Sequence, residues 1–190
     1  MRPPGPAAPP PVQVVRLGLL CGVGLALYVL EAAAPRPLPW MKLGLSNVAV
    51  LLALVLYGPL AGLAVAASKV LVGGLLSGAL AGPASVIGGG ATAASLVAMS
   101  LPRRWLPGML SPVGLSLLGA VAHQVSQLVL ARVYLAHGGL YALLPLFLVT
   151  GLLSGGLTGL VALGALRRLL RMGAAGAPPD RGRGGAAPRP

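Results

Sequence analysis

Acidic residues are almost absent from this chain, and their absence limits the chemistry that it can perform. Only two of the 190 residues are Asp or Glu, namely Glu31 and Asp180. Magnesium-diphosphate chemistry needs several oxygen ligands, and nucleoside triphosphatases need a GxxxxGK[ST] loop that cradles phosphates, which the sequence lacks. No other catalytic motif is visible. We therefore expect a protein that is not an enzyme and that carries no cofactor or metal of its own.

Charge of either sign is also scarce, which excludes a water-soluble globule. Charged residues make up 8% of the chain and hydrophobic residues 56%, whereas a soluble domain carries about 25% charged residues. The net charge of +12 is scattered between apolar runs and forms no basic stripe, so nucleic acid is a poor candidate for a partner. The single cysteine, Cys21, excludes an intrachain disulfide. The surface is therefore expected to face the lipid bilayer.

Prolines, glycines and charges divide the chain into six apolar segments, to be compared with the roughly 20 residues that cross a bilayer. The segments cover residues 14–34, 43–57, 59–77, 84–101, 112–135 and 140–168. The Pro/Gly/Ala-rich ends, residues 1–13 and 172–190, bury too little apolar area to order and are predicted to be disordered tails. The predicted fold class is all-α: a polytopic membrane protein with about six transmembrane helices in one bundle, residues 14–171.

Basic residues predict the orientation of this bundle, because cytoplasmic flanks carry an excess of Lys and Arg. If the amino terminus is cytoplasmic, the inner flanks hold Arg2, Arg16, Arg103, Arg104, Arg167, Arg168 and Arg171, and the outer flanks hold Arg36, Lys42 and Arg132. Both termini are therefore predicted to be cytoplasmic, in a bacterial cell membrane. One alternative is that the first segment is a cleaved signal peptide, since Arg16, an apolar run and "EAAAP" imitate its three regions.

Polar residues inside the segments gather on one side of the predicted membrane. The candidate substrate-binding residues are Glu31, Lys42, Asn47, Lys69, His123, Gln124 and Gln127. Lys69 is the strongest candidate, because an ionisable group in an apolar helix is costly unless it is paired or wet. Two alternatives stay open: Asn47 and the glutamines can join helices by hydrogen bonds, and Glu31 and Lys69 can form a structural pair.

Small residues form a second pattern, at intervals of four. Gly18, Gly22 and Ala26 make a stripe in the first segment that suits close contact with a partner helix. The runs "GGGATAAS" and "TGLLSGGLTG" in later segments carry further small residues. Packing inside the bundle is expected to account for most of these, with the first stripe as a candidate partner-docking face.

Four stretches together resemble a known family: "KLGLSN" (42–47), "SKVLVGGLLSG" (68–78), "LSPVGLSLLGAVAHQVSQL" (110–128) and "LVTGLLSGGLTG" (148–159). The family is the Gx transporter family, also catalogued as heptaprenyl diphosphate synthase component I. The resemblance implies a fold similar to the substrate-binding S components of energy-coupling factor transporters. Those subunits bind a vitamin or metal ion and work with a transmembrane coupling protein and ATPase subunits. It also implies that residues 35–42 form a lid over the site.

Three functions remain in competition. The first is a membrane protein that binds or transports a small solute, anionic or amphipathic in character, through the polar cluster. The second is a membrane accessory subunit, component I, of heptaprenyl diphosphate synthase in isoprenoid or menaquinone synthesis, without catalytic residues of its own. The third is a structural scaffold, which explains the glycines but leaves Lys69 without a purpose.

Overall fold

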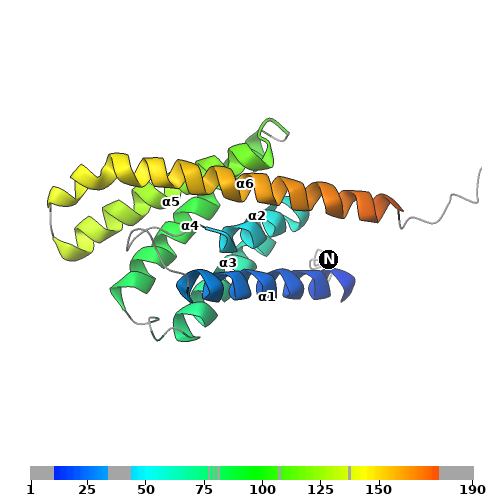
Figure 1. The fold of residues 1–190 in the computed structure, drawn as a ribbon, viewed down its shortest axis with the longest axis horizontal. Coiled ribbons are helices and arrows are strands. Elements are labelled where there is room, and N and C mark those ends of the chain that lie inside the picture. Colours follow the sequence, from blue (N-terminus) through cyan, green and yellow to red (C-terminus); the bar gives the residue numbers. More distant parts are fainter. Residues whose placement is uncertain are drawn as a thin grey trace, which may run out of the picture.

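The computed structural model describes residues 11–33, 44–76, 78, 80, 82–106, 108–136 and 138–175. The part described is helical throughout (Figure 1). Its elements are α1 (Pro11–Ala33), α2 (Ser46–Tyr57), α3 (Pro59–Leu76), α4 (Pro83–Trp105), α5 (Pro112–Leu135), the 3₁₀ turn η1 (Gly138–Leu143) and α6 (Leu144–Ala175). The prediction of an all-α bundle is confirmed. The proposed lid, which includes Lys42, and most of both predicted tails lie outside the described residues.

Prolines and glycines set the helix boundaries, as the sequence indicated. In the described part of the chain, α1, α3, α4 and α5 each begin at a proline, whose fixed φ suits the first turn and whose missing N–H is not needed there. The Ser111 hydroxyl also caps α5 by accepting from Gly114 N–H at 3.1 Å. Gly58, at φ +95°, makes the sharp link between α2 and α3, a conformation that side chains disfavour.

Several boundaries differ from those predicted. α1 begins at Pro11, so the last residues of the expected amino-terminal tail are helical, and α6 continues to Ala175. α4 runs through Pro102 to Trp105, although the prolines of "PRRWLP" were expected to end it at residue 101. A proline removes one intrahelical hydrogen bond, and this loss is small when the proline lies in the last turns.

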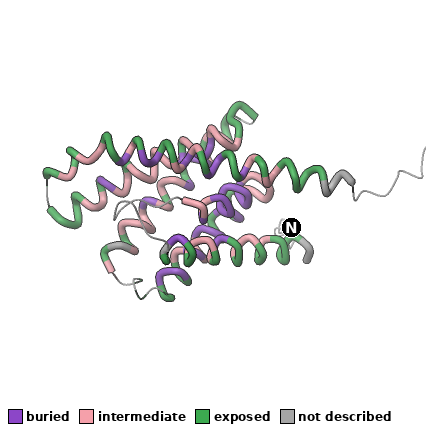
Figure 2. Tube along the Cα trace, in the orientation of Figure 1, coloured by how far each residue is buried: buried purple, intermediate pink, exposed green. Residues whose placement is uncertain are grey.

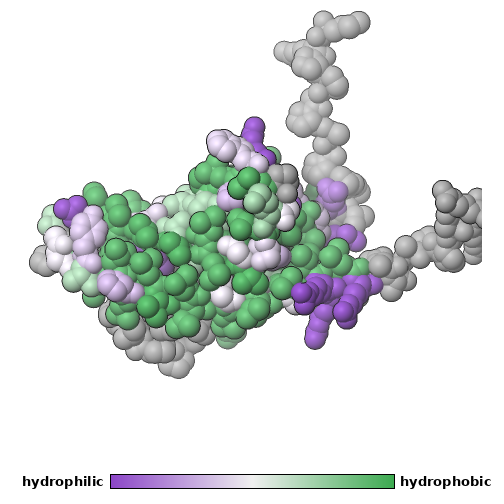
Figure 3. All heavy atoms as spheres, turned by 90° about the horizontal axis from the view of Figure 1, so that it is seen from above, coloured by the Kyte–Doolittle hydropathy of each residue, from purple (hydrophilic) through white to green (hydrophobic). Residues whose placement is uncertain are grey.

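Five of the described helices, all except α2, are long and apolar enough to cross a membrane. Their outward side chains are largely apolar, and Figure 3 shows a mainly hydrophobic surface with hydrophilic side chains chiefly near its margins. The start of α1 and the end of α6 lie at the same end of the bundle (Figure 1). These features are those of a multi-pass membrane protein.

The short helix α2 is the centre of the fold. Its residues from Val48 to Leu54 are all buried, and Figure 2 shows this buried stretch surrounded by the other helices. A helix that is apolar on every side can lie either in a bilayer or in a protein core, and the burial of these residues places α2 in the core. At about 1.5 Å per residue, its 12 residues extend about 18 Å, which is less than the roughly 30 Å thickness of a bilayer core. The second predicted segment is therefore a buried half-length helix.

Glycines on α6 allow it to lie directly against α5. A Cβ added at Gly151, Gly155 or Gly159 would lie 2.6 to 2.7 Å from Gln124 Cγ, Ala120 Cβ or Val113 Cα respectively. Atoms do not approach so closely. At Gly155 and Gly159 the contacted atoms cannot rotate away, so these positions require glycine unless the helices separate, whereas at Gly151 the flexible Gln124 side chain can move. The run "TGLLSGGLTG" thus serves internal packing, which is the role expected for most of the small residues.

Candidate intramembrane binding cavity

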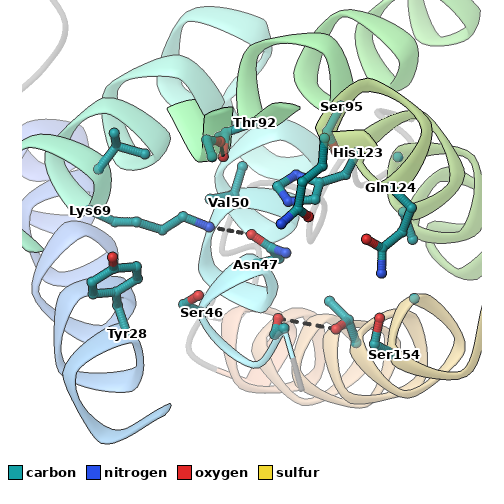
Figure 4. Close-up of a pocket in the computed structure, with 18 of the residues that line it drawn as sticks. Tyr28, Ser46, Asn47, Val50, Lys69, Thr92, Ser95, His123, Gln124 and Ser154 are labelled. Carbon is teal, nitrogen blue, oxygen red and sulfur yellow. Dashed lines mark hydrogen bonds between the residues drawn. The ribbon is translucent and has the colours of Figure 1, made fainter. Parts of the chain in front are cut away.

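A cavity of about 460 Å³ lies between the helices, and all six contribute to its wall (Figure 4). Its volume falls within the range of about 300 to 1,000 Å³ that is typical of sites for small ligands. The polar residues of the wall are Tyr28, Glu31, Ser46, Asn47, Lys69, Ser85, Thr92, Ser95, Ser116, His123, Gln124, Gln127, Ser154 and Thr158. Apolar side chains such as Val50, Met99 and Phe147 complete it. A polar cavity inside an apolar bundle is a candidate for a binding site.

Lys69 reaches into this cavity from α3 and is 5% exposed. Its ammonium group donates a hydrogen bond to the side-chain oxygen of Asn47, at the start of α2 (Figure 4). The adjacent Gly44 carbonyl accepts from Thr158 of α6 at 3.1 Å and from the Asn47 backbone N–H at 2.8 Å. Contacts from α3 and α6 therefore position the first turn of α2 within the cavity.

Glu31, at the end of α1, has a structural task at the same place. Its carboxylate accepts hydrogen bonds from Leu45 N–H at 2.7 Å and Ser46 N–H at 3.3 Å. These donors belong to the start of α2, where the helix dipole is positive and the N–H groups have no intrahelical partner. Glu31 is 8% exposed, so the interaction takes place away from solvent. The carboxylate thus connects α1 to α2 across the undescribed segment 34–43.

The third group of predicted residues lies along one side of α5. His123, Gln124 and Gln127 all line the cavity. The amide nitrogen of Gln124 lies 3.5 Å from the Thr150 hydroxyl of α6, to which it donates. This contact is of the helix-joining kind that the sequence left open for the glutamines. Of the seven predicted binding residues, the structure brings six together, and Lys42 lies outside the described residues.

The hydroxyl groups of the wall were not predicted from the sequence. Ser46, Ser95, Ser116, Ser154 and Thr158 all line the cavity. Ser154 and Thr158 are four residues apart, and this helical spacing was a usable signal that the cavity face of α6 is polar. Serine and threonine side chains in membrane helices often donate to the backbone of their own helix, so a hydroxyl group is a weaker sign of a ligand site than a charged group.

Comparison with protein families gives a match to the family described as heptaprenyl diphosphate synthase component I, over residues 20–164. The chain belongs to this family. The matched region covers more than half of the sequence and includes every residue of the cavity wall, from Tyr28 to Thr158. Searches of curated proteins and of solved structures found no match.

The family description names a component of a prenyl diphosphate synthase, and such chemistry needs carboxylates for metal ions. Within residues 20–164 this chain has a single acidic residue, Glu31. Among the described residues, no three His, Cys, Asp or Glu side chains gather where they would hold a metal ion. The family name thus fits a partner of a synthase better than a synthase.

The predicted docking stripe faces outward from α1. Ala26 is exposed, and a Cβ added at Gly18 or Gly22 would meet no described atom within 4 Å. Gly24, by contrast, faces inward, where its Cβ would lie 3.2 Å from Ala49. The three residues are therefore accessible from outside the bundle, and their docking role stays a prediction.

Proposed function

We propose that this protein is a non-catalytic membrane component that binds a small ligand in the cavity around the first turn of α2. The observation that carries the proposal is Lys69, an ammonium group that is 5% exposed inside an apolar bundle and lines a cavity of about 460 Å³. Burial of such a group is costly, and intramembrane ionisable residues usually mark a ligand or ion path. A scaffold has no need for it.

The family match favours one setting for this component, an accessory subunit of heptaprenyl diphosphate synthase. Family membership is the specific support for this setting. In it, the chain would hold a soluble prenyltransferase at the membrane, through basic flanks such as Arg103 and Arg104. Prenyltransferase activity should then rise at least severalfold when the chain is co-expressed. Activity that is equal with and without the chain would exclude this setting.

The second setting is an S-component-like subunit of an energy-coupling factor transporter. Its support is the cavity itself, together with the outward stripe of Gly18, Gly22 and Ala26, which suits close contact with a transmembrane coupling protein. In this setting, native mass spectrometry after gentle purification should detect coupling and ATPase subunits. Substitution of Gly22 by Leu should remove those subunits while the bound ligand is retained. Copurification of a prenyltransferase instead would favour the first setting.

Lys69→Met tests the binding function that both settings share. Methionine keeps the length of the side chain and removes the ammonium group, so the bundle should still insert and fold. We expect at least a tenfold loss of bound small molecule in native mass spectra. Ser68→Ala is the matched control, because Ser68 neighbours Lys69 but does not line the cavity. Unchanged ligand occupancy in Lys69→Met would exclude the assigned site.

A further inference from the structure

Several polar groups on the cavity wall have no hydrogen-bond partner among the described residues. They are the amide nitrogen of Asn47, the hydroxyls of Ser46 and Ser116, and the side-chain amide of Gln127. Ser46 is 3% exposed and Ser116 is 6% exposed. Buried polar groups in native proteins are nearly always hydrogen-bonded, so groups such as these indicate bound molecules.

Helix α6 lies beside two of these groups, on α2 and on α5. A Cβ placed on Gly44 would lie 3.5 Å from the Asn47 amide nitrogen and 3.3 Å from the Thr158 hydroxyl. On the next face of α6, a Cβ placed on Gly155 would lie 3.2 Å from the Ser116 carbonyl oxygen. One turn of α6 thus contacts the loop before Asn47 as well as the Ser116 position of α5. Asn47 of α2 and Ser116 of α5 therefore both lie beside this turn of α6, and Gln127 lines the cavity about three turns further along α5.

Lys69 determines which way the Asn47 amide faces. An ammonium group can only donate hydrogen bonds, so the Asn47 oxygen must lie on the Lys69 side. The amide nitrogen must then point away from Lys69, as Figure 4 shows. The cavity therefore meets an N–H donor that the neighbouring positive charge polarises. Lys69 is a positioning residue, and its charge acts through Asn47.

Glu31 and Lys69 are the acidic and the basic side chain of the described wall, which also includes His123. With Glu31 and Lys69 in their charged forms and His123 neutral, the charges of the described wall cancel. The carboxylate is bonded to the start of α2 and the ammonium group to Asn47. An anion added to a charge-balanced site of low dielectric has no counter-charge to offset its desolvation. A ligand without net charge meets no such penalty.

We infer that the cavity takes a small uncharged ligand that presents a carbonyl-type acceptor to the Asn47 amide nitrogen and further polar groups to Ser46, Ser116 and Gln127. The inference rests on the proposed binding function, and of the anionic and amphipathic solutes expected from the sequence it excludes the anionic ones. It also makes this cavity unsuitable for the diphosphate of a prenyl compound, which carries several negative charges.

The test uses the purified full chain in lipid nanodiscs. The protein is incubated with the filtered small-molecule extract of its expression host, washed, and examined by native mass spectrometry with identification of the released compound. The expected compound is uncharged at pH 7 and contains a carbonyl group. Added inorganic diphosphate should leave its occupancy unchanged. Recovery of a carboxylate or phosphate compound, or displacement by diphosphate, would overturn the inference but leave the binding function standing. Recovery of no compound would contradict the binding function itself.

Variants separate the polar contacts from general effects on folding. Asn47→Asp replaces the N–H donor by an acceptor and should lower occupancy at least tenfold. In Lys69→Arg the new side chain can still only donate hydrogen bonds, so it should hold the Asn47 oxygen and retain most of the ligand occupancy. In Lys69→Met this donor is lost, so the Asn47 amide is free to turn and ligand occupancy should fall.

Ser116→Ala supplies a second, independent readout. Loss of a buried hydroxyl without a protein partner should raise the melting temperature of the ligand-free protein, while ligand occupancy should fall about tenfold. A higher melting temperature with unchanged occupancy would show that Ser116 does not contact the ligand, and would contradict the assigned contact set.

Discussion

Gly159→Ala tests whether the close approach of α5 and α6 holds the bundle together. The added Cβ would lie 2.7 Å from Val113 Cα and 3.0 Å from Ser116 Cβ. The nearer atom belongs to the backbone, so a rotamer change cannot relieve the contact and the helices must separate. Overpacking of this kind costs about 1–3 kcal/mol, and alanine recovers about 1 kcal/mol through its better helix propensity. Taking the upper end of the first range, we expect a net destabilisation of about 2 kcal/mol.

Gly164→Ala is the matched control on the same helix, since its Cβ would meet no described atom within 4 Å. It should leave the free energy of unfolding unchanged or raise it by up to about 1 kcal/mol. Both variants are unfolded by titrating mixed micelles with sodium dodecyl sulfate, and helix content is followed by circular dichroism. If the free energy of unfolding of the Gly159→Ala variant equals that of the Gly164→Ala variant, close packing of α5 against α6 is not the reason for glycine at position 159.

Three further substitutions test how α2 is held. Glu31→Gln removes the charge from two hydrogen bonds at the start of α2 and should destabilise the protein by about 1–2 kcal/mol, with faster amide exchange in the first turn; unchanged exchange would contradict this role. Arg103→Gln loses the 2.7 Å hydrogen bond to the Val55 carbonyl and should cost about 1 kcal/mol in the same micelle titration, whereas exposed Arg104→Gln should cost nothing measurable. Thr158→Val removes the hydrogen bond from the Thr158 hydroxyl to the Gly44 carbonyl and should lower ligand occupancy more than it lowers the free energy of unfolding. If stability and occupancy both equal those of the parent chain, this hydrogen bond does not position the start of α2.

Most of the fold was predictable because its boundaries are local features of the sequence. Prolines and glycines interrupt the apolar runs, and the helices begin or end close to those positions. What could not be predicted is the enclosure of α2, because hydropathy reports how apolar a segment is and not what surrounds it. The exact ends of α1, α4 and α6 were also missed, since a helix continues past a proline or a polar residue when the cost is small.

The site was predictable where it uses charged and amide side chains. Glu31, Asn47, Lys69 and the polar residues of α5 are conspicuous in an apolar chain, and the structure places them on one cavity wall. Their role in binding stays a prediction. The partners within that wall were not predictable, because the Glu31 contact with the start of α2 depends on how two helices meet. The sequence suggested a Glu31–Lys69 pair, but the described hydrogen bonds of Glu31 lead to the α2 backbone.

The enclosed helix α2 connects the Glu31 carboxylate with the cavity. A helix of about 18 Å cannot cross a bilayer core of roughly 30 Å, and the first N–H groups of a helix have no intrahelical partner. Glu31, the single carboxylate of the described residues, accepts hydrogen bonds from the Leu45 and Ser46 N–H groups at this helix start. Because α2 stops short, its first residues form part of a cavity wall to which the other five helices contribute. The carboxylate that stabilises this short helix also balances Lys69, and together they leave a site suited to an uncharged ligand.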